Sequence, residues 1–220
     1  QRTSESKQVT PAEAAPPVVV ASTSAAAGSS PGAPADFEPQ KVDVSESAMG
    51  TTVRVIAYTN VQADEARVRD AIQKAVAEIR RLENVMTTWR PSEITKLDEH
   101  GGDWVTVSND TLDVLEKSIW AGKTSKGTFD ITFASLGNVW KFGDAADANP
   151  KPPSKAEVEK KRKLIDYRKI EVDRAQHRAR IGRDQHIDLG GIAKGYAVDA
   201  AARVMKSGGV EDFLVQAGGD

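Results

Sequence analysis

The stretch IDLGGIAKGYAVDAAARVM, residues 187–205, places a short apolar segment, two glycines and a lysine directly before a helix of small residues. The segment HIDL, residues 186–189, is predicted to be a strand that ends beside the glycines, and the helix is expected to begin near Ile192. Glycine allows a ligand to approach the backbone, and the first N–H groups of a helix attract anions. Two interpretations stay open: a glycine turn in which Asp188 caps the helix, or a phosphate cradle to which Lys194 adds positive charge.

Strand and helix patterns alternate irregularly before and after this stretch. Residues 41–47 and 51–59 are rich in β-branched or alternating side chains, which indicates two strands joined at Ala48, Met49 and Gly50. Residues 63–87 repeat apolar side chains every three or four positions, as in an amphipathic helix. The other expected elements are a short helix capped by Ser92, a strand at 103–107, a helix capped by Ser108 or Asn109, a strand or turn at 127–132, a helix at 155–164, a β-hairpin at 169–182 and a strand at 212–217. This order predicts an α+β fold, a single mixed body of helices and antiparallel sheet, rather than a doubly wound parallel sheet.

Residues 1–40 differ from the rest of the chain because they are mainly alanine, proline, serine and glycine. Such a segment buries too little apolar surface to offset the entropy lost on ordering, so it is predicted to be a disordered tether before a domain at 41–220. A tether in this position suits a protein that is held at a membrane by a lipid anchor upstream of Gln1.

Charge and composition exclude several classes of function. The formal net charge of -2 provides no basic field, so nucleic acid is not an expected partner. The chain has no cysteine, which excludes disulfides, thiolate metal sites and cysteine nucleophiles. The histidines lack metal-ligand spacing, and no apolar run approaches the roughly 20 residues that a membrane span requires.

Two further stretches carry residues that suit a flat ligand. In GTFDITFASLGNVWKFG, residues 127–143, Thr128, Phe129 and Asp130 offer backbone, an aromatic face and a carboxylate, although aromatic residues at such spacings usually belong to a core. Trp89 lies in a loop beside a proline, where it is either an exposed stacking partner or an anchor buried against the body.

The order of these motifs is more specific than any one of them. MGTT, MTTWRPSEITKLDEH, GTFDITFASLGNVWKFG, IDLGGIAKGYAVDAAARVM and FLVQAGGD together resemble the ApbE family of FAD:protein FMN transferases, from about Met49 to Asp220. The resemblance implies an α+β body with an FAD cleft between two lobes, exported to the periplasmic side of the bacterial inner membrane and often lipid-anchored. It also implies a magnesium-dependent reaction that splits the FAD pyrophosphate, attaches FMN to a threonine of a partner flavoprotein and releases AMP.

The resemblance assigns roles in cofactor binding by position. Met49 is implied to lie against the flavin nucleotide, and Trp89 stands where the family usually has a tyrosine that stacks on a ring of FAD. Exchange of tyrosine for tryptophan keeps a flat π surface and loses a hydroxyl group. Thr128, Phe129 and Asp130 match the block that binds the adenosine part of FAD.

The same comparison assigns the glycine-rich stretch to the cofactor and the metal. Asp188 and Lys194 match residues that contact FAD, and Gly191 matches the position whose main-chain carbonyl binds magnesium. The catalytic group and the other metal ligands are expected beyond Asp220, which implies that the chain lacks the C-terminal part of the family's body. Two alternatives remain open: an FAD pyrophosphatase that yields free FMN and AMP, or a flavin-binding module without catalysis.

Overall fold

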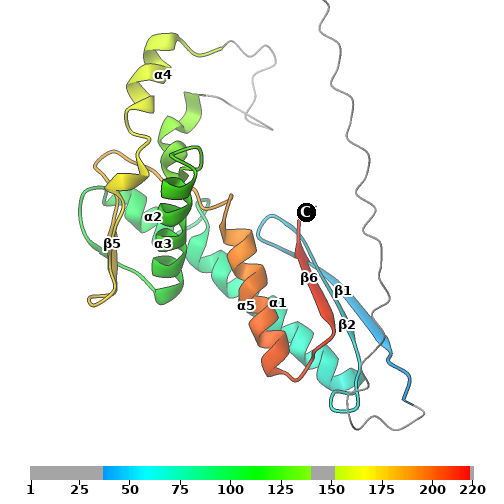
Figure 1. Cartoon of the computed structure of the whole chain (residues 1–220). Helices are drawn as coiled ribbons and strands as arrows, with labels where there is room; N and C mark the ends of the chain where they lie inside the picture. Colours follow the sequence, from blue (N-terminus) through cyan, green and yellow to red (C-terminus); the bar gives the residue numbers. More distant parts are fainter. Residues whose placement is uncertain (1–36, 140–151, 219–220) are drawn as a thin grey trace, which may run out of the picture. The chain divides into compact units, whose positions relative to one another are not determined.

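A computed structural model describes residues 37–139 and 152–218 (Figure 1). The predicted tether therefore lies outside the described residues, apart from positions 37–40. The end of the aromatic motif, from Trp140 onward, also lies outside them. Among the helices of the described ranges, none is both long enough and apolar enough to cross a membrane.

Three antiparallel strands form the first sheet, in the order β1 (Lys41–Ala48), β2 (Thr51–Tyr58) and β6 (Phe213–Ala217). All three strands are confirmed where the sequence predicts them. Ala48 pairs with Thr51, so β1 and β2 are joined by a two-residue turn, and Met49 and Gly50 have φ values of 53° and 67°. Two positive φ angles are typical of the tight turn that matches the twist of a hairpin. A positive φ is uncommon for a residue other than glycine, and Met49 adopts it here.

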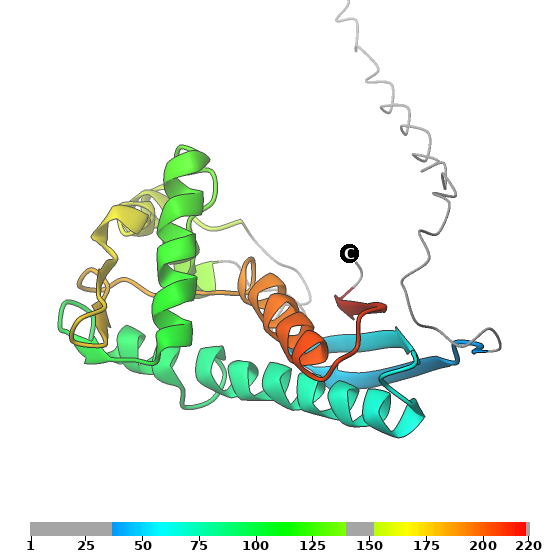
Figure 2. The same cartoon turned by 60° about the horizontal axis from the view of Figure 1, so that its bottom comes forward.

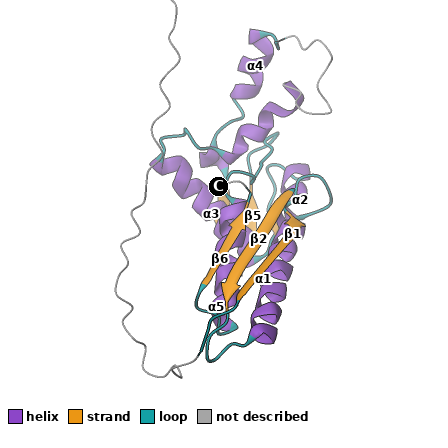
Figure 3. Cartoon of the chain, turned by 90° about the vertical axis from the view of Figure 1, so that its right-hand side faces the viewer, coloured by secondary structure: helices purple, strands orange, loops and turns teal. Residues whose placement is uncertain are grey.

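Helices α1 (Glu65–Met86) and α5 (Ala193–Ser207) lie side by side along this sheet (Figures 1 and 3). Alternate residues of β2 are buried, as expected for a strand with one face on a core. The contact side of α5 is mostly alanine, which allows the two helix backbones to approach closely. The buried residues of these elements include Val53, Val55, Ala57, Val68, Ala71, Ile72, Ala75, Ile79, Leu82, Ala193, Ala197, Ala200 and Ala201.

The remaining helices and short strands form a second group of elements (Figure 2). Its sheet has the order β3-β5-β4 with antiparallel pairs. Its members are α2 (Glu93–Glu99), β3 (Val105–Thr106), α3 (Asn109–Thr124), the 3-10 helix η1 (Ile131–Val139), α4 (Lys155–Arg162), the 3-10 helix η3 (Tyr167–Lys169), β4 (Glu171–Asp173) and β5 (Arg178–Arg180). The predicted hairpin is confirmed as β4 and β5. The predicted α+β fold with antiparallel pairing is likewise confirmed.

Side chains fix the starts of the helices that lead toward the glycine-rich stretch. Ser108 caps α3, which decides between the two predicted caps. Ser92 caps α2 as predicted and forms a reciprocal capping box with Thr95. These caps define where the loops between the helices begin and end.

The prediction of a strand at HIDL is wrong. Residues 186–189 alternate in burial, with Ile187 and Leu189 buried and His186 exposed, but they pair with no other strand in the described part of the chain. Their N–H groups donate instead to non-strand partners: His186 N to Ser135 Oγ at 2.9 Å, Ile187 N to Asp98 Oδ1 at 2.9 Å and Asp188 N to the Ile131 carbonyl at 2.9 Å. The sequence pattern correctly predicted which of these residues are buried, whereas a strand also needs a neighbour that local sequence does not reveal.

Candidate functional site

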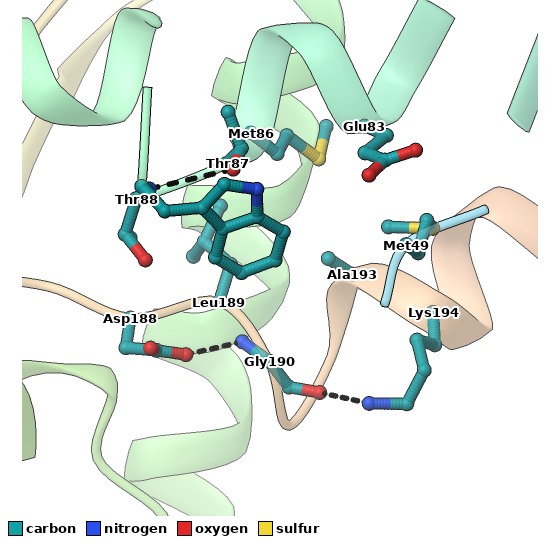
Figure 4. Close-up of a pocket in the computed structure, with 11 residues that line it drawn as sticks. Met49, Glu83, Met86, Thr87, Thr88, Asp188, Leu189, Gly190, Ala193 and Lys194 are labelled. Carbon is teal, nitrogen blue, oxygen red and sulfur yellow. Dashed lines mark hydrogen bonds between the residues drawn. The ribbon is translucent and has the colours of Figure 1, made fainter. Parts of the chain in front are cut away.

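A pocket opens where α1 ends and α5 begins (Figure 4). It brings together four predicted site residues from four separate segments: Met49, Trp89, Asp188 and Lys194. The other residues that line it are Glu83, Met86, Thr87, Thr88, Leu189, Gly190 and Ala193. Residues that are far apart in sequence therefore share one hollow, as a ligand-binding site requires.

The loop that carries Trp89 is anchored at both ends. Thr87 forms the C-cap of α1, and its carbonyl accepts a hydrogen bond from Ser92 Oγ at 2.5 Å. The indole is 66% exposed, which excludes the interpretation of Trp89 as an anchor buried against the body. Trp89 lines the pocket together with Met86 and Gly190. Its open face can stack on a flat ligand ring.

The Asp188 carboxylate and the Lys194 ammonium shape the glycine turn between them. Asp188 Oδ1 accepts a hydrogen bond from the Gly190 N–H at 2.6 Å, and Lys194 Nζ donates to the Gly190 carbonyl at 2.9 Å (Figure 4). In the described structure, no side chain caps the N-terminus of α5 at Ile192, so the interpretation of Asp188 as a helix cap is wrong. Asp188 instead closes the turn that precedes the helix.

Phe129 connects the second predicted motif to this turn. A Cβ atom placed on Gly191 would lie 3.1 Å from Phe129 Cε2, which is closer than most real Cβ contacts. The Phe129 ring therefore packs against the bare backbone of Gly191, and a larger residue there would require the ring to shift by a few tenths of an ångström. One residue of the block 128–130 thus lies beside the pocket without lining it.

Asp130 serves local structure. Its Oδ1 accepts from the backbone N–H and the hydroxyl of Thr132, at 2.9 and 2.6 Å, and its Oδ2 accepts from the Tyr167 N–H at 2.9 Å. Asp130 lines a different hollow, together with Lys123, Lys126, Gly127, Ile165, Asp166, Tyr167 and Arg168. Thr128 is exposed and lines neither hollow. The structure therefore separates Asp130 from the pocket that holds the other predicted cofactor residues.

The described residues do not by themselves complete a magnesium site. Mg²⁺ prefers six oxygen ligands in octahedral geometry. Among the described residues there is no group of three or more His, Cys, Asp or Glu side chains that could hold a metal ion. The neighbouring Gly190 carbonyl is already bonded to Lys194, and Gly191 supplies one further main-chain oxygen.

Glu83 and Met86 line the pocket although the sequence did not single them out. Both lie in the last turns of α1, where the periodic pattern marks one as a charge and the other as core. The Glu83 side chain is only 16% exposed and lies 3.7 Å from the guanidinium of Arg90. Their position one turn before the Trp89 loop is the signal that identifies them.

The pocket as these residues form it encloses about 60 Å³. Pockets that hold whole drug-sized ligands are commonly about 300–1,000 Å³. The described residues therefore enclose room for only part of a large ligand.

The ApbE family model matches residues 49–220. The FAD:protein FMN transferase of Vibrio cholerae is 28% identical over 185 residues, which are 82% of this chain and 54% of that protein. The enzyme of the same name from Haemophilus influenzae is 23% identical over 83% of this chain and 54% of its own length. The chain spans about half the length of the curated relatives it matches.

Solved structures are similar over the same region. The crystal structure of the ApbE protein from Thermotoga maritima has a TM-score of 0.69 at 28% identity, over 82% of this chain and 57% of that chain. The flavin transferase ApbE from Vibrio cholerae has a TM-score of 0.70 at 26% identity, over 81% of this chain and 57% of its own. The apo flavinyl transferase ApbE of Pseudomonas stutzeri, at 22% identity and a TM-score of 0.74, is similar in fold.

Proposed function

This chain belongs to the ApbE family, and from that premise we propose that the protein is an FAD:protein FMN transferase. Its substrate is FAD, and its second substrate is a threonine hydroxyl on a partner flavoprotein. The threonine oxygen attacks the phosphorus of the FMN half, the bond from that phosphorus to the bridging oxygen breaks, and AMP leaves with that oxygen. The hydroxyl proton is released, so the products are FMN-threonine and AMP.

The observation that carries this proposal is the convergence of Met49, Trp89, Asp188 and Lys194 on one pocket. These positions lie in the turn after β1, the loop after α1, the segment before α5 and the first turn of α5. The family resemblance assigns each of these residues to FAD from its sequence position. Their proximity to one another comes from the fold. Four unrelated residues on four separate segments would not be expected to line the same pocket.

Each side chain offers a distinct contact to FAD. The exposed indole of Trp89 stacks on a ring, a type of contact that contributes about 0.5–1.5 kcal/mol. Lys194 uses one of its three N–H donors on the Gly190 carbonyl, which leaves the others for phosphate oxygens. Asp188 holds the turn with one oxygen and has a second oxygen that can accept from a ligand hydroxyl. Phosphoryl transfer depends mainly on such positioning and charge compensation.

The proposal includes Mg²⁺, with the Gly191 carbonyl as one ligand and the remaining ligands supplied from outside the described residues. When bound, Mg²⁺ would offset negative charge on the diphosphate. It also includes export to the periplasmic side of the inner membrane and a lipid anchor upstream of Gln1, which the composition of residues 1–40 supports.

The proposed function is tested by incubating the intact protein with FAD, Mg²⁺ and a candidate acceptor flavoprotein. The expected result is an acceptor whose mass increases by one covalently attached FMN, with one AMP released for each adduct. Free FMN and AMP without the adduct would contradict the transferase and support the pyrophosphatase. FAD binding without any AMP would support the non-catalytic module instead.

A further inference from the structure

Asp98 belongs to α2, the helix that follows the Trp89 loop, and is not among the residues that line the pocket. The start of α2 is tied to that loop because Ser92 Oγ donates to the Thr87 carbonyl at 2.5 Å. Near the other end of α2, Asp98 Oδ1 accepts a hydrogen bond from the Ile187 N–H at 2.9 Å. One short helix is therefore bonded to two segments that line the pocket, the Trp89 loop and the residues just before Asp188.

The contact between Asp98 and Ile187 joins residues 89 positions apart in sequence. Ile187 is buried, and its neighbour in the segment, Asp188, lines the pocket. Because the segment 186–189 has no strand partner among the described residues, individual hydrogen bonds hold it in place together with the burial of Ile187 and Leu189. A shift at Ile187 would be transmitted directly to Asp188 and to the Gly190 turn.

Placing a charged carboxylate at position 98 costs free energy because the side chain is largely removed from water. The Asp98 side chain is only 20% exposed, and burial raises the pKa of Asp98, although the Ile187 N–H and His186 oppose that rise. Its second oxygen, Oδ2, lies 3.4 Å from His186 Nδ1, and the Asp188 carboxylate is the other charged group that acts on it. Asparagine would accept the same hydrogen bond without the cost of burying a charge.

We propose that Asp98 is a positioning residue for the FAD pocket: its hydrogen bond to the Ile187 N–H fixes the segment that carries Asp188 and Gly190 relative to the Trp89 loop. Asp98 does not line the pocket and acts only through that segment. The role rests on the proposed function for the identity of the ligand, whereas the bond itself does not depend on it.

The test compares variants of Asp98 in the intact protein by FAD titration, thermal unfolding and hydrogen exchange at the Ile187 amide. Asp98→Asn keeps an oxygen for the Ile187 N–H and removes the charge. Asp98→Leu removes both, and Asp98→Glu keeps the charge but moves the oxygen by one methylene. Glu99→Gln, on the exposed neighbour in the same helix, is the matched control.

We expect Asp98→Leu to raise the Kd for FAD about tenfold, which is the loss of about one hydrogen bond to a charged group. Its Ile187 amide should exchange at least about tenfold faster, since the local bond that protects it is gone. Asp98→Asn should bind FAD within about twofold of wild type and should keep the amide protected. If Asp98→Leu does not fold, Asp98→Glu should show the same loss of affinity.

Several results would overturn the inference. Equal FAD affinity and equal Ile187 exchange in wild type and Asp98→Leu would show that the bond fixes nothing. Equal losses of affinity in Asp98→Asn and Asp98→Leu would show that the charge matters and not the acceptor. If wild type itself does not bind FAD, the proposed function fails, and the exchange rates still decide whether Asp98 holds the segment.

Discussion

Two motifs that sequence resemblance assigns to the same cofactor are used differently by the fold. The turn 188–191 contributes Asp188 and Gly190 directly to the pocket beside Trp89. The block 128–130 instead places Phe129 against Gly191, and Asp130 accepts hydrogen bonds from Thr132 and Tyr167. A residue type and its spacing indicate that a motif belongs to a site, whereas its hydrogen-bond partners indicate whether it contacts the ligand or supports those that do.

The largest expected effect is a loss of stability when Asp130, which supports the fold, is replaced. Asp130→Ala should lower the free energy of unfolding by about 3 kcal/mol, because two backbone N–H groups and one hydroxyl lose their acceptor. Denaturant unfolding measures the change. Asp130→Asn, which retains one carbonyl oxygen, should lose about 1 kcal/mol. Unchanged stability with a large loss of FAD affinity would instead place Asp130 at the ligand.

Removing the ammonium at the pocket is expected to have the next largest effect. Lys194→Met should raise the Kd for FAD by about tenfold to 150-fold, because a charge-assisted bond to phosphate contributes about 1.5–3 kcal/mol. Titration of flavin fluorescence at two salt concentrations measures the loss. Lys206→Met, in the last turn of the same helix, is the control and should bind as wild type does. Equal behaviour of the two variants would argue against a diphosphate at the start of α5.

Replacing Trp89 should weaken FAD binding without lowering the stability of the fold. Trp89→Ala should raise the Kd for FAD about tenfold, since a stacked ring is lost. Because the indole is 66% exposed, the free energy of unfolding should change by no more than about 0.5 kcal/mol. Trp89→Tyr should retain most of the affinity. A loss of stability that accompanies the loss of binding would mean that Trp89 supports the fold.

The smallest effect concerns the pH dependence of stability at Asp98. Burial raises the pKa of Asp98 above the ordinary aspartate value of 3.8, so the folded state holds this proton more tightly than the unfolded state. Stability from this group is complete below pH 3.8 and is lost as the pH rises through the raised pKa. Asp98→Asn should therefore become increasingly more stable than wild type over that rise. Thermal unfolding of both proteins between about pH 3 and 7 measures this difference in stability. A difference that stays constant with pH would contradict a raised pKa for Asp98.

Local sequence patterns predicted most of the fold. The apolar repeat that contains Val68 and Ile72 predicted α1. The joint predicted at Ala48, Met49 and Gly50 contains the turn between β1 and β2, although Ala48 itself belongs to β1. The alternation in residues 186–189 correctly predicted which side chains are buried, but the predicted strand does not form, because pairing depends on residues far away in sequence. The same reason explains why Asp98, which bonds to this segment, carried no signal in the sequence.

The sequence predicted which residues lie at the candidate site better than it predicted what each of them does there. Met49, Trp89, Asp188 and Lys194 share the expected pocket, since the resemblance supplied all four. The separation of Asp130 from that pocket depends on which N–H groups lack another acceptor, and sequence does not show this. Glu83 lies in the pocket only because α1 ends where it does.

A crystal structure of the intact protein with FAD tests most directly whether the pocket at the start of α5 is the cofactor site. We predict a ring of FAD stacked on Trp89, with the diphosphate beside Gly190 and Lys194. FAD bound in the hollow lined by Lys126, Asp130 and Arg168, with the α5 pocket empty, would contradict this assignment.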